Sequence, residues 1–310
     1  MLIASGKAER VSWLVEDRAA ALVKAVPGLD EVLLFPRHDR SRLWAHARRL
    51  RSRRDDVVLD LQGNLKSRMQ LACLKAPRKL GFDAPLAKEG AQKGLTERFL
   101  PAGNTRHRIA ANVAILARLG IHGTLPVERP AIPLGHSQGI QRPDARTPRV
   151  LLHPGTSTFG QLKRWDPLRF ARLGDRLVQE RDAEVFVSAG PGESDLAQAI
   201  CDAMHERARP LQPSGLDDLA DELRATSLLV ASDSLPLHLA NALETPVLGL
   251  YGPKDPAVTG PYYPGARVVR SGVSCSPCTL RRCRDRICME QLESDTVFEA
   301  AQELLDGSTP

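Results

Sequence analysis

Short apolar runs that alternate with amphipathic stretches are the feature that most constrains the fold of this 310-residue chain. The runs are short and rich in β-branched residues, which favours buried strands over helices. They occupy residues 11–15, 32–35, 57–61, 150–152, 185–188, 228–232 and 247–250. Between them, stretches such as residues 167–179 place Phe170, Leu173 and Leu177 on one helical face. This alternation predicts βαβ units and therefore an α/β fold with parallel sheets.

The pattern also indicates two halves. Prolines and glycines cluster without periodicity over residues 133–149, and the βα pattern restarts beyond them. We therefore expect two Rossmann-like domains facing a cleft, over residues 1–140 and 141–310. A doubly wound domain normally begins with a central strand, but no strand or glycine-rich turn precedes residues 11–15. The N-terminal domain is thus expected to lack its first strand.

Composition excludes several classes of protein. Hydrophobic residues make up 42% of the chain and charged residues 26%, which is typical of a folded globular protein. No apolar run approaches the 18 residues of a membrane-spanning helix. The apolar stretch at the start of the chain ends too early for a secretory signal, which favours a cytoplasmic protein. The formal net charge of +6 permits an anionic partner without choosing among nucleotide, nucleic acid and membrane.

The loop that follows the strand at residues 150–152 has residue types that can hold a diphosphate. Gly155 lets the main chain approach a ligand, and Thr156 and Ser157 offer hydroxyls. Lys163 adds an ammonium group a few residues later. The loop does not match the P-loop pattern, so an ordinary polar βα loop is an equally good interpretation.

A second loop of this kind follows the strand at residues 228–232. Ser234 can cap the next helix, whose free N–H groups and dipole favour an anion. His238 lies one turn into that helix and can reach the same anion or pack against the strand. A lone histidine in an apolar helix is more often structural. Two phosphate-type loops in one half nevertheless favour an anion site there.

Two features of the N-terminal half admit both a functional and an ordinary interpretation. Gln62, Asn64 and Lys66 follow the strand at residues 57–61 and would face the cleft, although a plain turn explains them equally well.

Residues 37–54 contain eight arginines and one acidic residue. A solvated helix explains this charge, and a dock for anionic lipid headgroups or a phosphorylated acceptor is the alternative. Nucleic-acid binding fits poorly, since no recognition motif or stacking aromatics accompany the arginines.

Four cysteines close to the C-terminus suggest a third kind of chemistry. They are Cys275, Cys278, Cys283 and Cys288, in the spacing C-x2-C-x4-C-x4-C. Four thiolates can bind zinc or an iron–sulfur cluster, but zinc ribbons usually separate two C-x2-C pairs by a longer loop. Neighbouring arginines would alternatively lower the thiol pKa values. A metal- or redox-linked protein would leave the phosphate-type loops unexplained, so we expect no metal.

Taken in order, these segments resemble glycosyltransferase family 9, the ADP-heptose:lipopolysaccharide heptosyltransferases. The resemblance rests on residues 13–16, 60–67, 153–165, 233–238 and 251–256 and on the cysteine cluster with Met289. It implies a GT-B architecture in which the second domain binds the donor and the first binds the acceptor. It also suggests that the last helix, over residues 295–305, returns to the first domain.

The resemblance implies an inverting, metal-independent transfer of heptose from ADP-heptose to the lipopolysaccharide inner core, with no cofactor. The implied donor-binding residues are Thr156, Ser157 and Lys163 at the phosphates, Asp233, Ser234, Leu235 and His238 near phosphate and sugar, and Ser214 at the adenine. The acceptor-side residues are Gln62, Gly63, Asn64 and Lys66. The implied partners are the nucleotide sugar and a lipid-linked oligosaccharide at the inner face of the cytoplasmic membrane, with no nucleic acid.

Two departures from the family pattern bear on activity. Family members begin with a strand and a Gly-Asp turn whose aspartate activates the acceptor hydroxyl, and this sequence lacks that segment. No catalytic base is therefore assigned. The family glycine after Asp-Ser is here Leu235, whose side chain would crowd a phosphate or resist a positive φ. The alternative function is a catalytically impaired homologue that binds a nucleotide sugar without the base.

Overall fold

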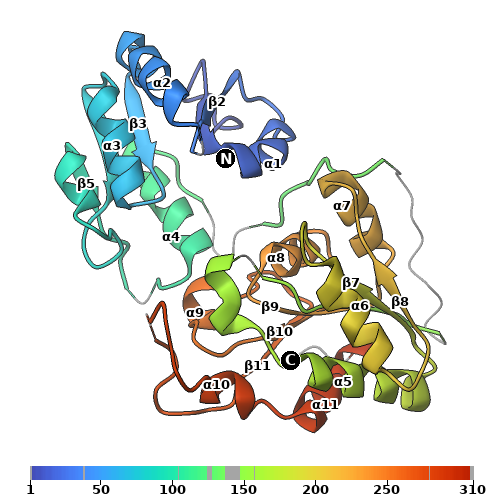
Figure 1. The fold of residues 1–310 in the computed structure, drawn as a ribbon. Coiled ribbons are helices and arrows are strands. Elements are labelled where there is room, and N and C mark those ends of the chain that lie inside the picture. Colours follow the sequence, from blue (N-terminus) through green and yellow to red (C-terminus); the bar gives the residue numbers. More distant parts are fainter. Residues whose placement is uncertain are drawn as a thin grey trace. The chain divides into compact units, whose positions relative to one another are not determined.

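The computed structural model describes residues 2–37, 39–103, 105–123, 128–136, 147–156, 158–278 and 280–307. The chain divides into two compact units, residues 1–128 and 129–310 (Figure 1). This division lies ahead of the boundary predicted at residues 140/141. Strands and helices alternate along both units, and every strand pair is parallel, so the predicted α/β class is confirmed. Within these described ranges, no helix is long and apolar enough to cross a membrane.

The second unit is built on one six-stranded parallel sheet with the order β11-β10-β9-β6-β7-β8. The strands are β6 (Arg149–His153), β7 (Glu184–Ser188), β8 (Ala208–Leu211), β9 (Leu228–Ser232), β10 (Val247–Leu250) and β11 (Ala266–Val269). The helices are η4 (Thr158–Lys163), α5 (Pro167–Arg181), α6 (Ser194–Ala203), α7 (Leu216–Arg224), α8 (Leu235–Ala242), α9 (Pro256–Thr259), α10 (Ile287–Glu290) and α11 (Ser294–Leu305).

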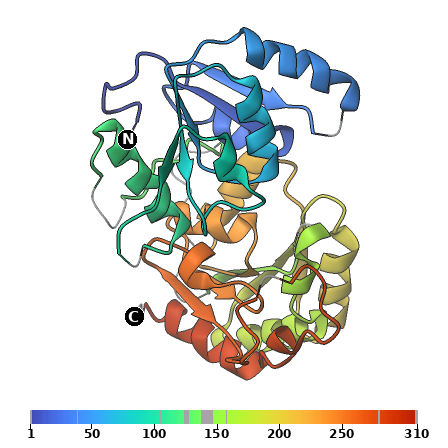
Figure 2. The same ribbon diagram turned by 90° about the vertical axis from the view of Figure 1, so that its left-hand side faces the viewer.

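Helices cover both faces of this sheet (Figures 1 and 2). On one face α5 packs against α6 and α11, and on the other α7 packs against α8. All five residues of β9 are buried, as expected of a strand between two helical layers. The helix expected to return to the first domain, α11, belongs to the second unit and buries Val297, Phe298 and Leu304 in its core.

Trp165 fixes the segment that leads from η4 into α5. Its side chain is only 2% exposed, and its ring packs edge-on against Phe170 at 4.9 Å between centroids. The indole Nε1 donates a hydrogen bond to the carbonyl of Leu292 at 2.8 Å. Asp166 then caps α5 by accepting a hydrogen bond from the amide of Leu168 at 2.7 Å. The loop between β6 and α5 therefore ends on a rigid anchor.

The first unit has two small parallel sheets, β1-β2 and β3-β4-β5, with no hydrogen-bonded pairing between them in the described chain. Its strands are β1 (Ser12–Glu16), β2 (Glu31–Phe35), β3 (Val57–Asp60), β4 (Arg78–Phe82) and β5 (Glu97–Phe99). Its helices are η1 (Asp17–Ala19), α1 (Ala20–Lys24), α2 (Arg40–Ser52), α3 (Leu65–Cys73), η2 (Ala91–Gly94), α4 (Arg108–Ala114) and η3 (Ile115–Leu119). A small core of Leu80, Phe82, Ala111 and Ile115 lies beside β4 and α4.

Candidate functional site

The strand order of the second unit creates a point at which two loops diverge. β6 lies between β9 and β7; the chain continues from β6 through β7 to β8 on one side and through β9, β10 and β11 on the other. Open α/β sheets bind ligands at the carboxyl ends of the strands where the order reverses in this way. The loops after β6 and β9 leave from this point, and they are the two phosphate-type loops of the sequence.

Lys163 and Asp233 join the two loops. The Lys163 Nζ lies 3.1 Å from Asp233 Oδ2 and also donates a hydrogen bond to the Asp233 carbonyl. The side chains are only 18% and 15% exposed. From α8, His238 Nε2 donates to Asp233 Oδ1 at 3.1 Å. An ammonium, a carboxylate and an imidazole therefore meet at the rim of the sheet.

The carboxyl group of Asp233 is held in its ionised form. Burial by itself opposes ionisation, but the hydrogen bond from His238 and the charge of Lys163 outweigh it, so the pKa of Asp233 lies below its usual value. At the end of β10, burial and the nearby charge of Asp233 raise the pKa of Tyr251. Asp233 thus holds the Nζ of Lys163 in place through an ion pair.

The loop after β6 already binds an anionic oxygen. The amide of Thr156, which is 5% exposed, donates to Glu193 Oε1 at 3.2 Å. Arg164 pairs with the same carboxylate, and its Nε donates to Thr156 Oγ1 at 3.1 Å. A Cβ at Gly155 would meet the Glu193 carboxylate, so this glycine gives the carboxylate room to lie against the loop. The N–H groups of the loop after β6 can therefore bind an anion.

Two hydroxyls at the end of β9 have no internal partner. Among the described residues, the buried Oγ atoms of Ser232 and Ser234 lack any hydrogen bond. Ser234 is the N-cap of α8, but its side chain does not cap the helix. A buried hydroxyl without a partner costs about 1–3 kcal/mol, so these groups favour a polar ligand at the N-terminus of α8.

Leu235 does not adopt the positive φ that the sequence led us to expect at this position. It is the first residue of α8 and is absent from the described non-glycine residues with positive φ, which are Glu89, Asp182 and Glu244. Its side chain is 49% exposed at the helix start. The backbone of α8 therefore begins without a left-handed residue at this position.

The remaining donor-side residues are placed as follows. Ser214 lies beyond β8 at the start of α7, where its main-chain N–H donates to Asp218 Oδ2 at 3.2 Å. Its side chain is exposed. The adenine contact expected of it stays a prediction. Ser157 lies outside the described residues, between Thr156 and η4.

In the first unit, the acceptor-side residues form a tightly bonded turn between β3 and α3. Asp60 Oδ1 accepts hydrogen bonds from the amides of Gln62 and Gly63 at 3.0 and 2.9 Å. Gly63 has a φ of +60°, and Asn64 caps α3 through a capping box with Ser67. The turn is therefore a rigid platform at the carboxyl end of β3.

Lys66 of the same platform is held by an ion pair. Its Nζ lies 2.6 Å from Glu16 Oε1 at the end of β1, and Arg37 pairs with the other oxygen of Glu16 at 2.9 Å. The Lys66 side chain is 42% exposed, so it presents its charge at this edge.

The four C-terminal cysteines differ in their exposure to solvent. Cys288 is buried, Cys278 is half-buried, and Cys275 and Cys283 are exposed. Within the part of the chain that the structure describes, no group of three or more His, Cys, Asp or Glu side chains has the arrangement of a metal site. Burial, with neighbouring cysteines adding to it, raises the pKa of the Cys288 thiol, which disfavours the reactive thiolate.

His153, the last residue of β6, has a structural role. It is 5% exposed, and its Nδ1 lies 2.8 Å from Ser188 Oγ. Burial lowers the pKa of His153 to about 4, so the imidazole is neutral in the folded protein at physiological pH.

This buried imidazole predicts a pH dependence of stability. Between about pH 6.5, the pKa of an exposed histidine, and the folded value, the unfolded chain binds a proton that the folded chain does not. The His153 contribution is therefore present above this window and is lost as the pH falls through it, by about 1 kcal/mol at pH 5.5. Urea unfolding of the protein and of His153→Gln measures the difference in stability at pH 8 and 5.5. The difference should shrink at pH 5.5, and an equal difference at both values would contradict the assignment.

Comparison with known proteins identifies similar chains. Residues 43–287 match the sequence model of glycosyltransferase family 9 (heptosyltransferase). The chain is 29% identical over 164 residues to lipooligosaccharide heptosyltransferase 2 of Campylobacter jejuni, a match covering 51% of each chain. The aligned part thus spans about half the length of this relative. The chain is 25% identical over 281 residues to lipopolysaccharide heptosyltransferase 1 of Pseudomonas aeruginosa, covering 87% of this chain and 78% of that protein.

The fold is also shared with a solved structure. An Escherichia coli heptosyltransferase solved with ADP matches with a TM-score of 0.69 and 18% identity. The match covers 98% of this chain and 92% of that one. At this level of identity the similarity shows the fold.

Proposed function

Because the chain belongs to glycosyltransferase family 9, the heptosyltransferase family, we propose that it transfers a heptose from ADP-heptose to the inner core of lipopolysaccharide. One observation supports the proposal most directly. Thr156 and Lys163 follow β6, Ser234 follows β9, and these two neighbouring strands flank the point where the strand order of the sheet reverses. Two relatives at 29% and 25% identity are heptosyltransferases, and the E. coli heptosyltransferase was solved with ADP.

In the proposed donor complex, the pyrophosphate lies between the loops after β6 and β9. The hydroxyls of Thr156 and Ser234 and the N-terminus of α8 donate hydrogen bonds to the phosphate oxygens. Lys163 adds a positive charge, positioned by Asp233. A phosphate contact of Ser157 and an adenine contact of Ser214 are part of the proposal and remain predictions from the sequence.

The reaction is a single displacement with inversion at the anomeric carbon. An acceptor hydroxyl forms a new bond to that carbon while the bond to the β-phosphate oxygen breaks. ADP leaves with the electron pair, and the hydroxyl proton passes to solvent water. Negative charge develops on the β-phosphate, where Lys163 and the N–H groups of α8 would stabilise it. Gln62, Gly63, Asn64 and Lys66 are proposed to contact the acceptor.

A transfer assay separates this function from that of a non-catalytic binder. The full chain is mixed with ADP-heptose and heptose-deficient lipopolysaccharide, with EDTA present, and release of ADP is followed together with the mass of the lipid product. Heptose transfer insensitive to EDTA supports the proposal. ADP binding without transfer identifies the impaired homologue, and absence of both overturns the assignment.

We further propose that α2 docks on the inner face of the cytoplasmic membrane. The helix contains no acidic residue, and its exposed side chains include Arg48, Arg51 and Trp44, the last 66% exposed. The guanidinium of Arg51 lies 5.8 Å from the ring centroid of Trp44. On the neighbouring α3, Met69 is 65% exposed. Cations beside exposed apolar side chains are suited to anionic headgroups over acyl chains.

Neutralising two of these arginines should weaken membrane binding. Each cation near an anionic surface contributes about 1 kcal/mol, so Arg48→Gln with Arg51→Gln should lower partitioning about 30-fold. The change is measured by sedimentation at low salt with vesicles in which about one lipid in three is the anionic phosphatidylglycerol. The matched control neutralises exposed cations of the second unit, Arg172→Gln with Lys254→Gln. Equal loss in both double variants would contradict docking through α2.

A further inference from the structure

A long loop of the second unit joins β11 to α10 (Figure 1). It covers residues 270–286 and contains no helix or strand in its described part, residues 270–278 and 280–286. Loops longer than about 15 residues without regular structure are uncommon in compact domains, and ordered ones usually carry a function. The proposed donor-binding residues include none from this loop.

The first half of the loop is held against the turn after β10. Arg270 Nη2 donates a hydrogen bond to Ser276 Oγ at 2.9 Å, and that hydroxyl donates to the carbonyl of Gly252. The main-chain N–H of Cys278 donates to the carbonyl of Pro253 at 2.8 Å. These contacts fix the path of the chain up to residue 278.

The end of the loop is anchored in the core and on η4. Cys288 and Met289, in α10, are 8% and 2% exposed and belong to the hydrophobic core. Ser271 Oγ donates to the carbonyl of Cys288 at 2.9 Å, which ties the start of the loop to α10. Arg286 Nη1 donates to the carbonyl of Gln161 in η4 at 3.3 Å. The loop therefore has a fixed base at both ends.

Between these anchors lies a basic tip, residues 280–285, in which every residue is exposed to solvent. Together with Arg286 the tip contains four arginines and one acidic residue, Asp285. Apolar side chains stand at both ends of this charge. Leu280 at its start is 58% exposed, and Ile287 just beyond it is 38% exposed. The basic tip thus presents cations and aliphatic side chains together.

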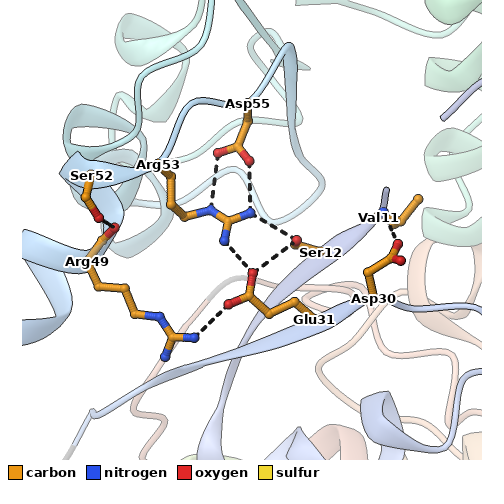
Figure 3. A network of polar contacts seen from close by, with 8 residues as sticks. All are labelled: Val11, Ser12, Asp30, Glu31, Arg49, Ser52, Arg53 and Asp55. Carbon is orange, nitrogen blue, oxygen red and sulfur yellow. Dashed lines mark hydrogen bonds and ion pairs between the residues drawn. The ribbon is translucent and has the colours of Figure 1, made fainter. Parts of the chain in front are cut away.

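Two arginines of the basic tip have no partner in the fold. Arginines that stabilise the first unit have acidic partners, as Arg49 and Arg53 show by both pairing with Glu31 (Figure 3). Among the described residues, the guanidinium groups of Arg282 and Arg284 have no hydrogen-bond or ion-pair partner. Their charge is therefore available to an external anion.

We infer that the basic tip is a membrane-contact surface of the second unit, which binds anionic lipid headgroups through its arginines and inserts Leu280 and Ile287 at the edge of the acyl chains. Cations beside exposed aliphatic side chains are suited to this boundary. The fixed base means that little chain entropy is lost on binding. Nucleic acid fits less well, because the loop contains no aromatic residue on which a base stacks. This surface is separate from α2, and the inference does not depend on the proposed transfer reaction.

Vesicle sedimentation of the full chain tests the arginines. With vesicles in which about one lipid in three is phosphatidylglycerol, Arg282→Gln with Arg284→Gln should lower partitioning about 30-fold at low salt. The matched control, Arg172→Gln with Arg207→Gln, removes the same number of charges from exposed positions of the second unit. It should leave partitioning nearly unchanged. Equal loss in the two double variants, or no binding by the unaltered chain, would overturn the inference.

Two further measurements separate the basic tip from the other proposed sites. If only Arg48→Gln with Arg51→Gln weakens vesicle binding, α2 remains a docking helix and the inference for the basic tip is overturned. The ADP affinity of Arg282→Gln with Arg284→Gln should be unchanged by titration calorimetry, because neither arginine is among the proposed donor-binding residues. A weaker ADP affinity would assign these arginines to the donor site and would also overturn the inference.

A matched pair of leucines tests whether the basic tip reaches the acyl chains. Leu280 and Leu168, which lies in α5, are both 58% exposed. Leu280→Ser should lower partitioning to the same vesicles about tenfold, because the aliphatic side chain no longer leaves water on binding. Leu168→Ser should leave partitioning unchanged. Equal partitioning of the two serine variants would overturn the inference.

Discussion

Replacing Lys163 by alanine is expected to weaken ADP binding about 100-fold. A hydrogen bond between charged groups contributes about 1.5–3 kcal/mol, and removal of the ammonium also leaves Asp233 facing the phosphates without compensation. Titration calorimetry with ADP measures the effect.

Two further variants make the Lys163 result interpretable. Lys163→Met keeps most of the side-chain volume and should lose as much affinity as alanine, because the charge is the missing element. Lys254→Ala removes an exposed lysine from the same unit and should leave the affinity unchanged. An ADP affinity that stays the same in Lys163→Met, in a protein with an unaltered melting temperature, would contradict the assignment of Lys163.

Replacing Trp165 by alanine is expected to destabilise the second unit by about 3–5 kcal/mol, the usual range for removal of a buried aromatic side chain. The indole is 2% exposed, contacts Phe170 and donates to the carbonyl of Leu292, so the change leaves a cavity and an unpaired acceptor. Urea unfolding monitored by far-UV circular dichroism measures the loss.

Leu168→Ala is the control for this prediction. Leu168 follows Trp165 by three residues but is 58% exposed, so its removal should change the stability by about 0.5 kcal/mol or less. A loss below about 1 kcal/mol for Trp165→Ala would show that Trp165 does not anchor the end of the loop after β6.

The sequence predicted β1, β2, β3, β6, β7, β9 and β10, and it missed β4, β5, β8 and β11. Residues 228–232 and 247–250 match β9 and β10 to the residue, because these strands are continuous apolar runs. Among the missed strands, β8 at a sheet edge contains Arg209 and Pro210, and β4, between β3 and β5, begins with Arg78 and Lys79. Such strands owe their conformation to a neighbouring strand, which periodicity along the chain does not reveal.

The candidate site was also predicted only in part. The sequence places Thr156 and Asp233 after strands, and the structure brings them to one rim because β6 and β9 are neighbours. The contacts among Thr156, Arg164 and Glu193 were not predicted, although Glu193 ends the turn after β7. A pairing across 29 residues depends on strand order, which spacing alone does not determine. The position of β7 beside β6 is the signal that would have revealed it.

Protection by ADP provides the most direct test of the pyrophosphate site. Hydrogen exchange of the full chain is compared at saturating ADP and at the same concentration of adenosine, which lacks the phosphates. ADP should slow exchange over residues 154–164 and 233–238 together, and adenosine should leave both segments unchanged. If ADP binds while these two segments exchange as in the free protein, the pyrophosphate lies elsewhere and the proposed donor site is wrong.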